Sequence, residues 1–227
     1  VAQPAATSDT TMQQRRPIPY PITPDQGFER AVEAGTRTRS GEPGANYWTN
    51  TAEYDLNATV DPAANELRGS GTIRYHNHSP DTLRQLVVHL RQNIHEEGAF
   101  RNRSAEVTGG MTLDRIDLEG AGDLGRVPGF RSLHTRLVIA LPSPLMPDST
   151  ASLDLEWHFP IPGADNFRMG QDGEVYFLGY WYPHMAVYDD VNGWTAQPYQ
   201  GDGEFYMGYA DYDVSVTVPA GWPVGAT

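Results

Sequence analysis

Histidine and acidic residues at short spacing are the first candidates for chemistry in this sequence. His95-Glu96 begins like the His-Glu-x-x-His motif, which binds zinc through two imidazoles on one face of a helix. Ala99 stands where the second histidine is needed, and Gly98 disfavours a helix. We therefore interpret His95–Ala99 as a polar loop rather than a zinc site.

A second pair, His76 and His78, has the spacing that places both rings on one face of a strand, as a metal site in a sheet requires. Ser79-Pro80-Asp81 follows at once and ends the strand, so a surface turn is the favoured interpretation.

The acidic pairs Asp189-Asp190 and Asp202/Glu204 have the chemistry for acid–base work or calcium binding. The alternating acidic pattern of a calcium loop is incomplete, so we interpret them as solvated turn residues. The sequence has no cysteine and no Gly-x-Ser-x-Gly motif, and therefore predicts neither a Cys–His nucleophile nor a nucleophile elbow.

Aromatic residues crowd the stretch that leads into the last alternating segment. Trp and Tyr dominate ligand platforms and interfaces, but they also fill small cores beneath long loops. Both interpretations stay open for this set, which comprises Tyr180, Trp181, Tyr182, Tyr188, Trp194, Tyr199, Phe205 and Tyr206.

The elements that must position these residues are mostly strands, because apolar and polar residues alternate with a period of two from Tyr47 onward. Apolar residues alternate with polar ones over 54–60 and again over 67–75, with the turn residues 61–65 between them, which predicts a hairpin. Gly69 and Gly71 on its inner face predict a bulge or the close approach of another backbone.

Further strands are expected at 86–90, at 111–118 with a kink, at 134–141, at 151–159 and at 212–218. Pro142-Ser-Pro144 predicts a turn, and 175–178, which is apolar on both faces, predicts a central strand. This pattern favours an all-β fold: a mainly antiparallel β-sandwich or curved sheet over residues 47–227.

Residues 1–46 are expected to form an extended segment with a short helix. Thr23 as N-cap and Pro24 at the first helical position predict a helix that runs to about Ala34 and ends at Gly35. The small residues of 1–8 resemble the end of an export signal, which favours a periplasmic or extracellular location; a chain without cysteine is also compatible with the cytoplasm.

The net charge restricts the class of partner. Acidic residues outnumber basic ones by 29 to 16, which gives a formal charge of −13 and argues against nucleic acid or an anionic membrane. No apolar run reaches the roughly 18–20 residues that span a bilayer.

With these elements in place, the sequence resembles the N-terminal β-domain of aminopeptidase N-type (gluzincin) zinc metallopeptidases, most closely a bacterial branch. The resemblance covers residues 47–227 in order. It rests on a series of segments: Tyr54–Pro62 with Leu67–Tyr75, Asn77–Leu83, Leu86–Asn93, Trp181–Pro183, Val187–Asp190 and Asp211–Gly221.

The resemblance implies a saddle-like, largely antiparallel domain that rests on a catalytic domain. That catalytic domain would bind the zinc ion and carry the motifs Gly-x-Met-Glu-Asn and His-Glu-x-x-His. Neither motif occurs in this sequence. We therefore expect no cofactor in this chain, no catalysis by it alone, and a catalytic domain after Thr227. In the family, this domain lends the active site a Gln or Glu that binds the amino end of the peptide substrate. Gly179–His184 contains neither, so Tyr180, Trp181, Tyr182 and His184 are the candidate substrate-binding residues instead.

Two other functions remain open from the residues themselves. One is an exported carbohydrate-binding module in which Trp181, Tyr182 and Trp194 form a platform for sugar rings. The other is a purely structural interaction domain.

Overall fold

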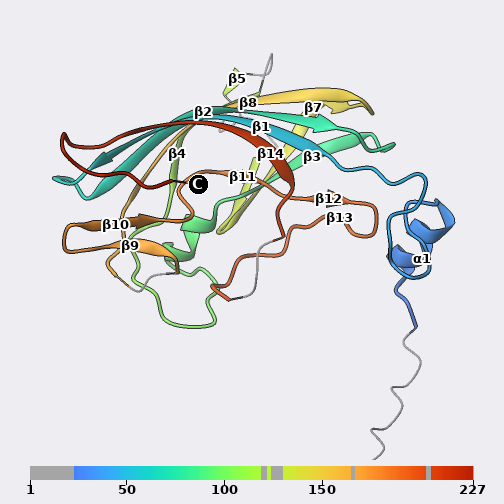
Figure 1. Cartoon of the computed structure of the whole chain (residues 1–227), viewed down its shortest axis with the longest axis horizontal. Coiled ribbons are helices and arrows are strands. Elements are labelled where there is room, and N and C mark those ends of the chain that lie inside the picture. Colours follow the sequence, from blue (N-terminus) through green and yellow to red (C-terminus); the bar gives the residue numbers. More distant parts are fainter. Residues whose placement is uncertain (1–22, 119–121, 124–129, 165–166, 203–205, 227) are drawn as a thin grey trace, which may run out of the picture.

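The computed structural model describes residues 23–118, 122–123, 130–164, 167–202 and 206–226 (Figure 1). The residues of 1–8 on which the export prediction rests lie outside this part of the chain. Glu204 of the predicted acidic pair and Phe205 of the aromatic set also lie outside it. No helix among the described residues combines the length and apolar character needed to cross a bilayer.

The N-terminal helix α1 (Gln26–Glu33) begins two residues later than predicted. Asp25, not Thr23, is the N-cap, and its carboxylate accepts a hydrogen bond of 2.8 Å from the backbone N–H of Phe28. Pro24 therefore precedes the helix. Gly35 has φ = +73° and follows the C-cap Ala34, which confirms the predicted end.

A large sheet forms one layer of the β-domain. Its six strands run in the order β14 (Tyr209–Thr217), β1 (Thr51–Asp61), β2 (Glu66–Asn77), β8 (Ser149–Pro160), β4 (Thr112–Leu118) and β5 (Gly122–Asp123). Neighbouring strands are antiparallel except β1 and β14, which are parallel. The predicted hairpin is β1–β2, and the predicted kink is a register shift between Leu113 and Arg115.

A smaller sheet closes the core from the other side. It runs in the order β11 (His184–Met185), β3 (Leu83–His89), β7 (Arg136–Leu145) and β6 (Phe130–Leu133). The 3₁₀ helix η1 (Arg91–His95) continues from β3. Apolar side chains of both sheets form one core, which includes Leu56, Ile73, Leu86, Ile139, Leu153 and Phe159. The prediction of a mainly β, largely antiparallel fold is confirmed.

Two short hairpins lie below the large sheet at opposite ends of the molecule, as Figure 1 shows. They are β9 (Met169–Asp172) with β10 (Val175–Leu178), and β12 (Tyr188–Asp189) with β13 (Gly193–Trp194). The prediction that 175–178 is a central strand is therefore wrong: among the described strands β10 pairs only with β9, and Val175 and Phe177 are exposed. The predicted turn at Pro142–Pro144 is wrong too, because β7 continues to Leu145. These prolines lie where β7 slips out of register with β3, so no ladder hydrogen bond is required of them.

Gly69 leaves space for the side chain of Trp157. It marks neither a bulge nor the close approach of another backbone. The register of β2 is regular on both sides, but a Cβ at Gly69 would lie 2.2 Å from the Trp157 indole. The indole Nε1–H in turn donates a 2.8 Å hydrogen bond to the backbone carbonyl of Trp181. A small residue in β2 thus allows a ring from β8 to anchor the aromatic segment.

The edge strand β14 carries apolar side chains that the second layer does not cover. Val214 pairs with Leu56, and residues paired in this way share one face of the sheet. Leu56 is 1% exposed, whereas Val214 is 44% exposed; Tyr212 and Val216 are exposed to a similar degree. We call Tyr212, Val214 and Val216 the uncovered face.

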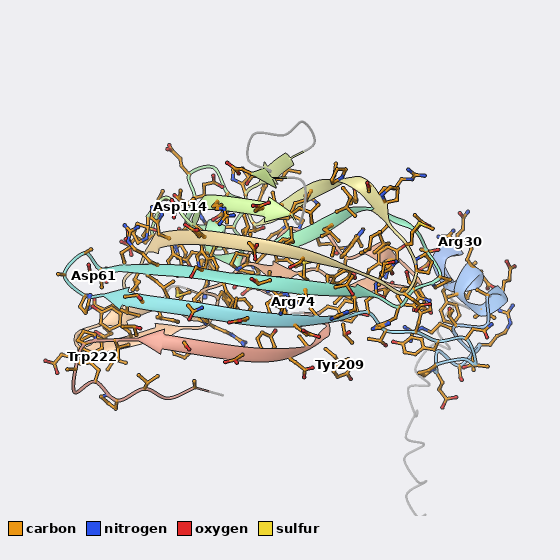
Figure 2. The ribbon with its side chains drawn as sticks, turned by 90° about the horizontal axis from the view of Figure 1, so that it is seen from above. Arg30, Asp61, Arg74, Asp114, Tyr209 and Trp222 are labelled. Atoms are coloured by element: carbon orange, nitrogen blue, oxygen red, sulfur yellow. The ribbon has the colours of Figure 1, made fainter. Side chains whose placement is uncertain are left out.

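The opposite face of the same edge is acidic. Asp211 lies beside Glu53 and Asp213 beside Asp55, and all four side chains are exposed. Figure 2 shows this face, with β14 as the last strand of the sheet, beginning at Tyr209. We call these four residues the acidic ladder.

Candidate functional site

Three of the four candidate substrate residues are consecutive in the chain, and we call them the aromatic wall. Tyr180, Trp181 and Tyr182 are each half-buried and lie in the segment between β10 and β11. The Trp181 ring packs against Trp157 with centroids 6.1 Å apart and against Tyr182 at 5.0 Å. Together with the hydrogen bond from Trp157, these contacts fix the direction in which the segment leaves the core.

Tyr182 joins this wall to the uncovered face. Its hydroxyl donates a 3.2 Å hydrogen bond to the hydroxyl of Tyr212, and its ring lies edge-on to Tyr54 at 5.7 Å. Tyr54 also stacks on Tyr212 with ring centroids 4.7 Å apart. Burial raises the pKa of both Tyr54 and Tyr182, so both hydroxyls stay neutral.

Tyr180 covers a buried cation. The Arg91 guanidinium lies 5.8 Å from the centroid of the Tyr180 ring, and Tyr199 meets that ring edge-on at 5.8 Å. Arg91 is 6% exposed; burial lowers its pKa, whereas the nearby tyrosines raise it. Arg91 is not among the site residues predicted from the sequence. The available signal is a lone arginine in the otherwise uncharged run 90–94.

His184, the fourth candidate, lies behind the wall rather than on it. It is 3% exposed, and its ring stacks on Tyr54 at 5.8 Å and contacts Tyr182 at 6.0 Å. Across the strand pair it faces His89, which is also buried. Neither nitrogen of His184 makes a hydrogen bond of ordinary length with the described residues, nor does Nδ1 of His89.

Both imidazoles are held neutral. Burial, followed by the charge of Arg91, lowers the pKa of His184 to about 3 and that of His89 to about 4.

A small cavity of about 50 Å³ adjoins His184, Tyr54, Tyr75 and Tyr188. Its size suits a few water molecules and not a peptide side chain.

Of the other described aromatic residues, Tyr199 contacts Tyr180, whereas Tyr188 and Trp194 belong to a separate cluster. Trp194 contacts Tyr188 at 5.2 Å and Tyr75 at 5.6 Å, beside the β12–β13 hairpin. Trp181 precedes β11 near the β9–β10 hairpin, and the described residues show no ring contact between Trp194 and either Trp181 or Tyr182. The fold does not assemble Trp181, Tyr182 and Trp194 into one platform.

Two of the predicted turn acids have structural partners, and the prediction that they are solvated is wrong for Asp190, whose side chain is 3% exposed. Asp190 forms a bidentate ion pair with Arg37, with a shortest distance of 2.8 Å. Asp189 accepts hydrogen bonds from the backbone N–H groups of Val191 and Asn192.

The histidines of the two rejected metal motifs also have local partners. His76 and His78 stack at 6.1 Å, and His76 contacts Glu53 and Thr150. His95 is fully buried at the end of η1, so its interpretation as part of a polar loop is wrong; its Nδ1 lies 2.9 Å from the carbonyl of Glu106. Within the described part of the chain, no three His, Asp or Glu side chains form a group that could hold a metal ion.

Comparisons with known proteins place zinc metallopeptidases among the similar solved structures. An M1 zinc metallopeptidase mutant from Deinococcus radiodurans is 18% identical, with a TM-score of 0.41; the alignment covers 79% of this chain and 34% of that chain. The same mutant bound to a Tyr-Ser-Ala substrate is 19% identical, with the same TM-score and a coverage of 79% and 35%. The chain thus spans about a third of the length of these structures. No family model matches the sequence, and no curated protein matches it.

Proposed function

We propose that this chain is the non-catalytic N-terminal domain of a zinc metallopeptidase of the aminopeptidase type. It would supply one wall of the substrate pocket and the face on which the catalytic domain rests. The observation that carries this proposal is the continuity between wall and uncovered face through Tyr182 and Tyr212. A partner seated on the uncovered face would lie directly beside the aromatic wall.

The resemblance in sequence supports the proposal because its segments fall on the elements that build this arrangement. Tyr54–Pro62 and Leu67–Tyr75 form most of β1 and β2, and Asp211–Gly221 includes most of β14. Trp181–Pro183 belongs to the wall. The matching residues therefore include the contact between Tyr54, Tyr182 and Tyr212.

The proposed division of chemistry follows from what the wall contains. Its neutral hydroxyls and ring faces suit apolar or aromatic peptide side chains, which they would shield from water. The catalytic domain would supply zinc to polarise the scissile carbonyl and activate water, with a glutamate as general base. We also propose export to the periplasm or exterior, which residues 1–8 favour.

The first test is the coding sequence that follows the codon for Thr227. The proposal expects His-Glu-x-x-His within one domain length. A stop codon, or a downstream domain without that motif, would contradict it. Quenching of tryptophan fluorescence by oligosaccharides would instead favour a carbohydrate-binding module.

The second test uses adjacent residues of β14 in the polypeptide that carries both domains. Val214→Asp places a charge on the uncovered face, whereas Ser215→Asp places the same charge on the opposite face. We expect Val214→Asp to reduce peptide turnover at least tenfold and to increase proteolysis between the domains. Ser215→Asp should do neither. Equal behaviour of the two variants would show that this face does not dock a catalytic domain.

A further inference from the structure

The wall is attached to the smaller sheet through very few contacts. Strand β11 contributes two residues, His184 opposite His89 and Met185 opposite Val88. The Met185 N–H donates a 3.0 Å hydrogen bond to the hydroxyl of Tyr54, and the Ala186 N–H donates one of 2.9 Å to the carbonyl of Val87. The protection of these two N–H groups from hydrogen exchange therefore measures the attachment of β11.

The central pair of this attachment consists of two imidazoles beside a fixed positive charge. Arg91, in η1, lies two residues after His89 and acts electrostatically on both rings. Arg136, in β7, also faces His89, with the backbone of Thr195. His184 contacts two neutral rings, those of Tyr54, from β1, and Tyr182. No carboxylate among the described residues makes an ion pair or hydrogen bond with either imidazole.

Protonation would therefore place new positive charge beside Arg91, and the backbone of Thr195 at His89 and of Met185 at His184 offsets only part of that cost. A charged imidazole has two N–H donors, and an unsatisfied buried charge is costly. Detachment of β11 would expose both rings to water and remove the conflict. We infer that the His89–His184 pair is an acid-sensitive latch whose protonation releases β11, and with it the aromatic wall, from the smaller sheet.

The size of the effect follows from proton linkage. The pKa values of about 4 and 3 in the attached state lie below the ordinary value of about 6.5 expected once the rings are solvated. Because the detached state binds more protons below pH 6.5, attachment weakens as the pH falls. Between pH 7.5 and 5, each histidine favours detachment about 30-fold, and the pair roughly a thousandfold. This inference does not depend on the proposed function, since it concerns only contacts within the chain.

The test is amide hydrogen exchange, with rates corrected for the pH dependence of intrinsic exchange. We expect the protection factors of Met185 and Ala186 to fall roughly a thousandfold from pH 7.5 to 5. Leu155, in the centre of β8, should remain more strongly protected than both at pH 5. Constant protection of Met185 and Ala186 would overturn the latch, and so would equal protection at all three sites, which indicates global unfolding.

Variants separate these two imidazoles from other titrating groups. His89→Leu combined with His184→Phe should abolish most of the pH dependence, whereas His158→Gln, on the exposed face of β8, should retain it. If the double variant does not fold, the native protein still decides the question through NMR titration of its imidazoles. The rings of His89 and His184 should stay neutral down to about pH 5 while β11 is attached. Titration of both near pH 6.5 with Met185 still protected would overturn the inference.

Discussion

Tyr54 holds three parts of the molecule together with one ring and one hydroxyl. Its ring packs between His184 and Tyr212, and its hydroxyl accepts the hydrogen bond from the backbone of Met185. The period of two in the sequence predicts that Tyr54 points into the core. It does not predict its partners, because they come from β11 and β14, far along the chain. The hydroxyl is therefore the part of this residue that sequence reasoning misses.

Removing that hydroxyl should cost more than removing the neighbouring one. Tyr54→Phe leaves the buried N–H of Met185 without an acceptor, which we expect to lower the free energy of unfolding by about 1–3 kcal/mol. Tyr182→Phe removes only the exposed bond to Tyr212, so we expect a loss below about 1 kcal/mol. Urea unfolding of both variants measures the difference, and equal losses would contradict this role of Tyr54.

At the scale of elements, alternation predicts which residues share a face but not whether another layer covers that face. The apolar residues of β14 alternate as regularly as those of β1, yet only those of β1 are buried. Likewise, the apolar composition of 175–178 predicts a central strand, whereas β10 forms an exposed hairpin with β9. The hairpin β1–β2 is predictable because its contacts are local. The parallel pairing of β1 with β14 is not, because nothing in either segment specifies the other.

Substitutions at one register position should show this difference directly. Leu56→Ala removes a fully buried side chain, and we expect a loss of about 2–5 kcal/mol. Val214→Ala, at the paired position on β14, should cost less than about 1 kcal/mol in the isolated chain because its side chain is already 44% exposed. Thermal unfolding of the two variants provides the comparison. A large loss for Val214→Ala would mean that the uncovered face is buried in solution, for example by a second copy of the chain.

At the scale of the whole molecule, repulsion among the negative charges destabilises the folded state. The formal charge is −13, and the acidic ladder sets carboxylates of like sign opposite each other across β1 and β14. Ion pairs such as Arg37–Asp190 compensate only locally.

Screening of these negative charges by salt should therefore stabilise the fold. We expect the melting temperature to rise by a few degrees when sodium chloride increases from 20 to 500 mM, because repulsion among acids outweighs the screened ion pairs. Differential scanning calorimetry at fixed pH measures this. A fall in melting temperature would show that the ion pairs dominate instead.

The acidic ladder also decides which strands can extend the sheet. The described residues leave the outer edge of β14 open, and such an edge invites another strand, including that of an identical molecule. Two copies that met edge to edge would bring two rows of carboxylates to within a few strand spacings of about 4.8 Å. A strand with lysine or arginine at alternate positions would meet no such barrier. The charges on β14 thus make its open edge unfavourable for self-assembly while leaving it accessible to a basic peptide.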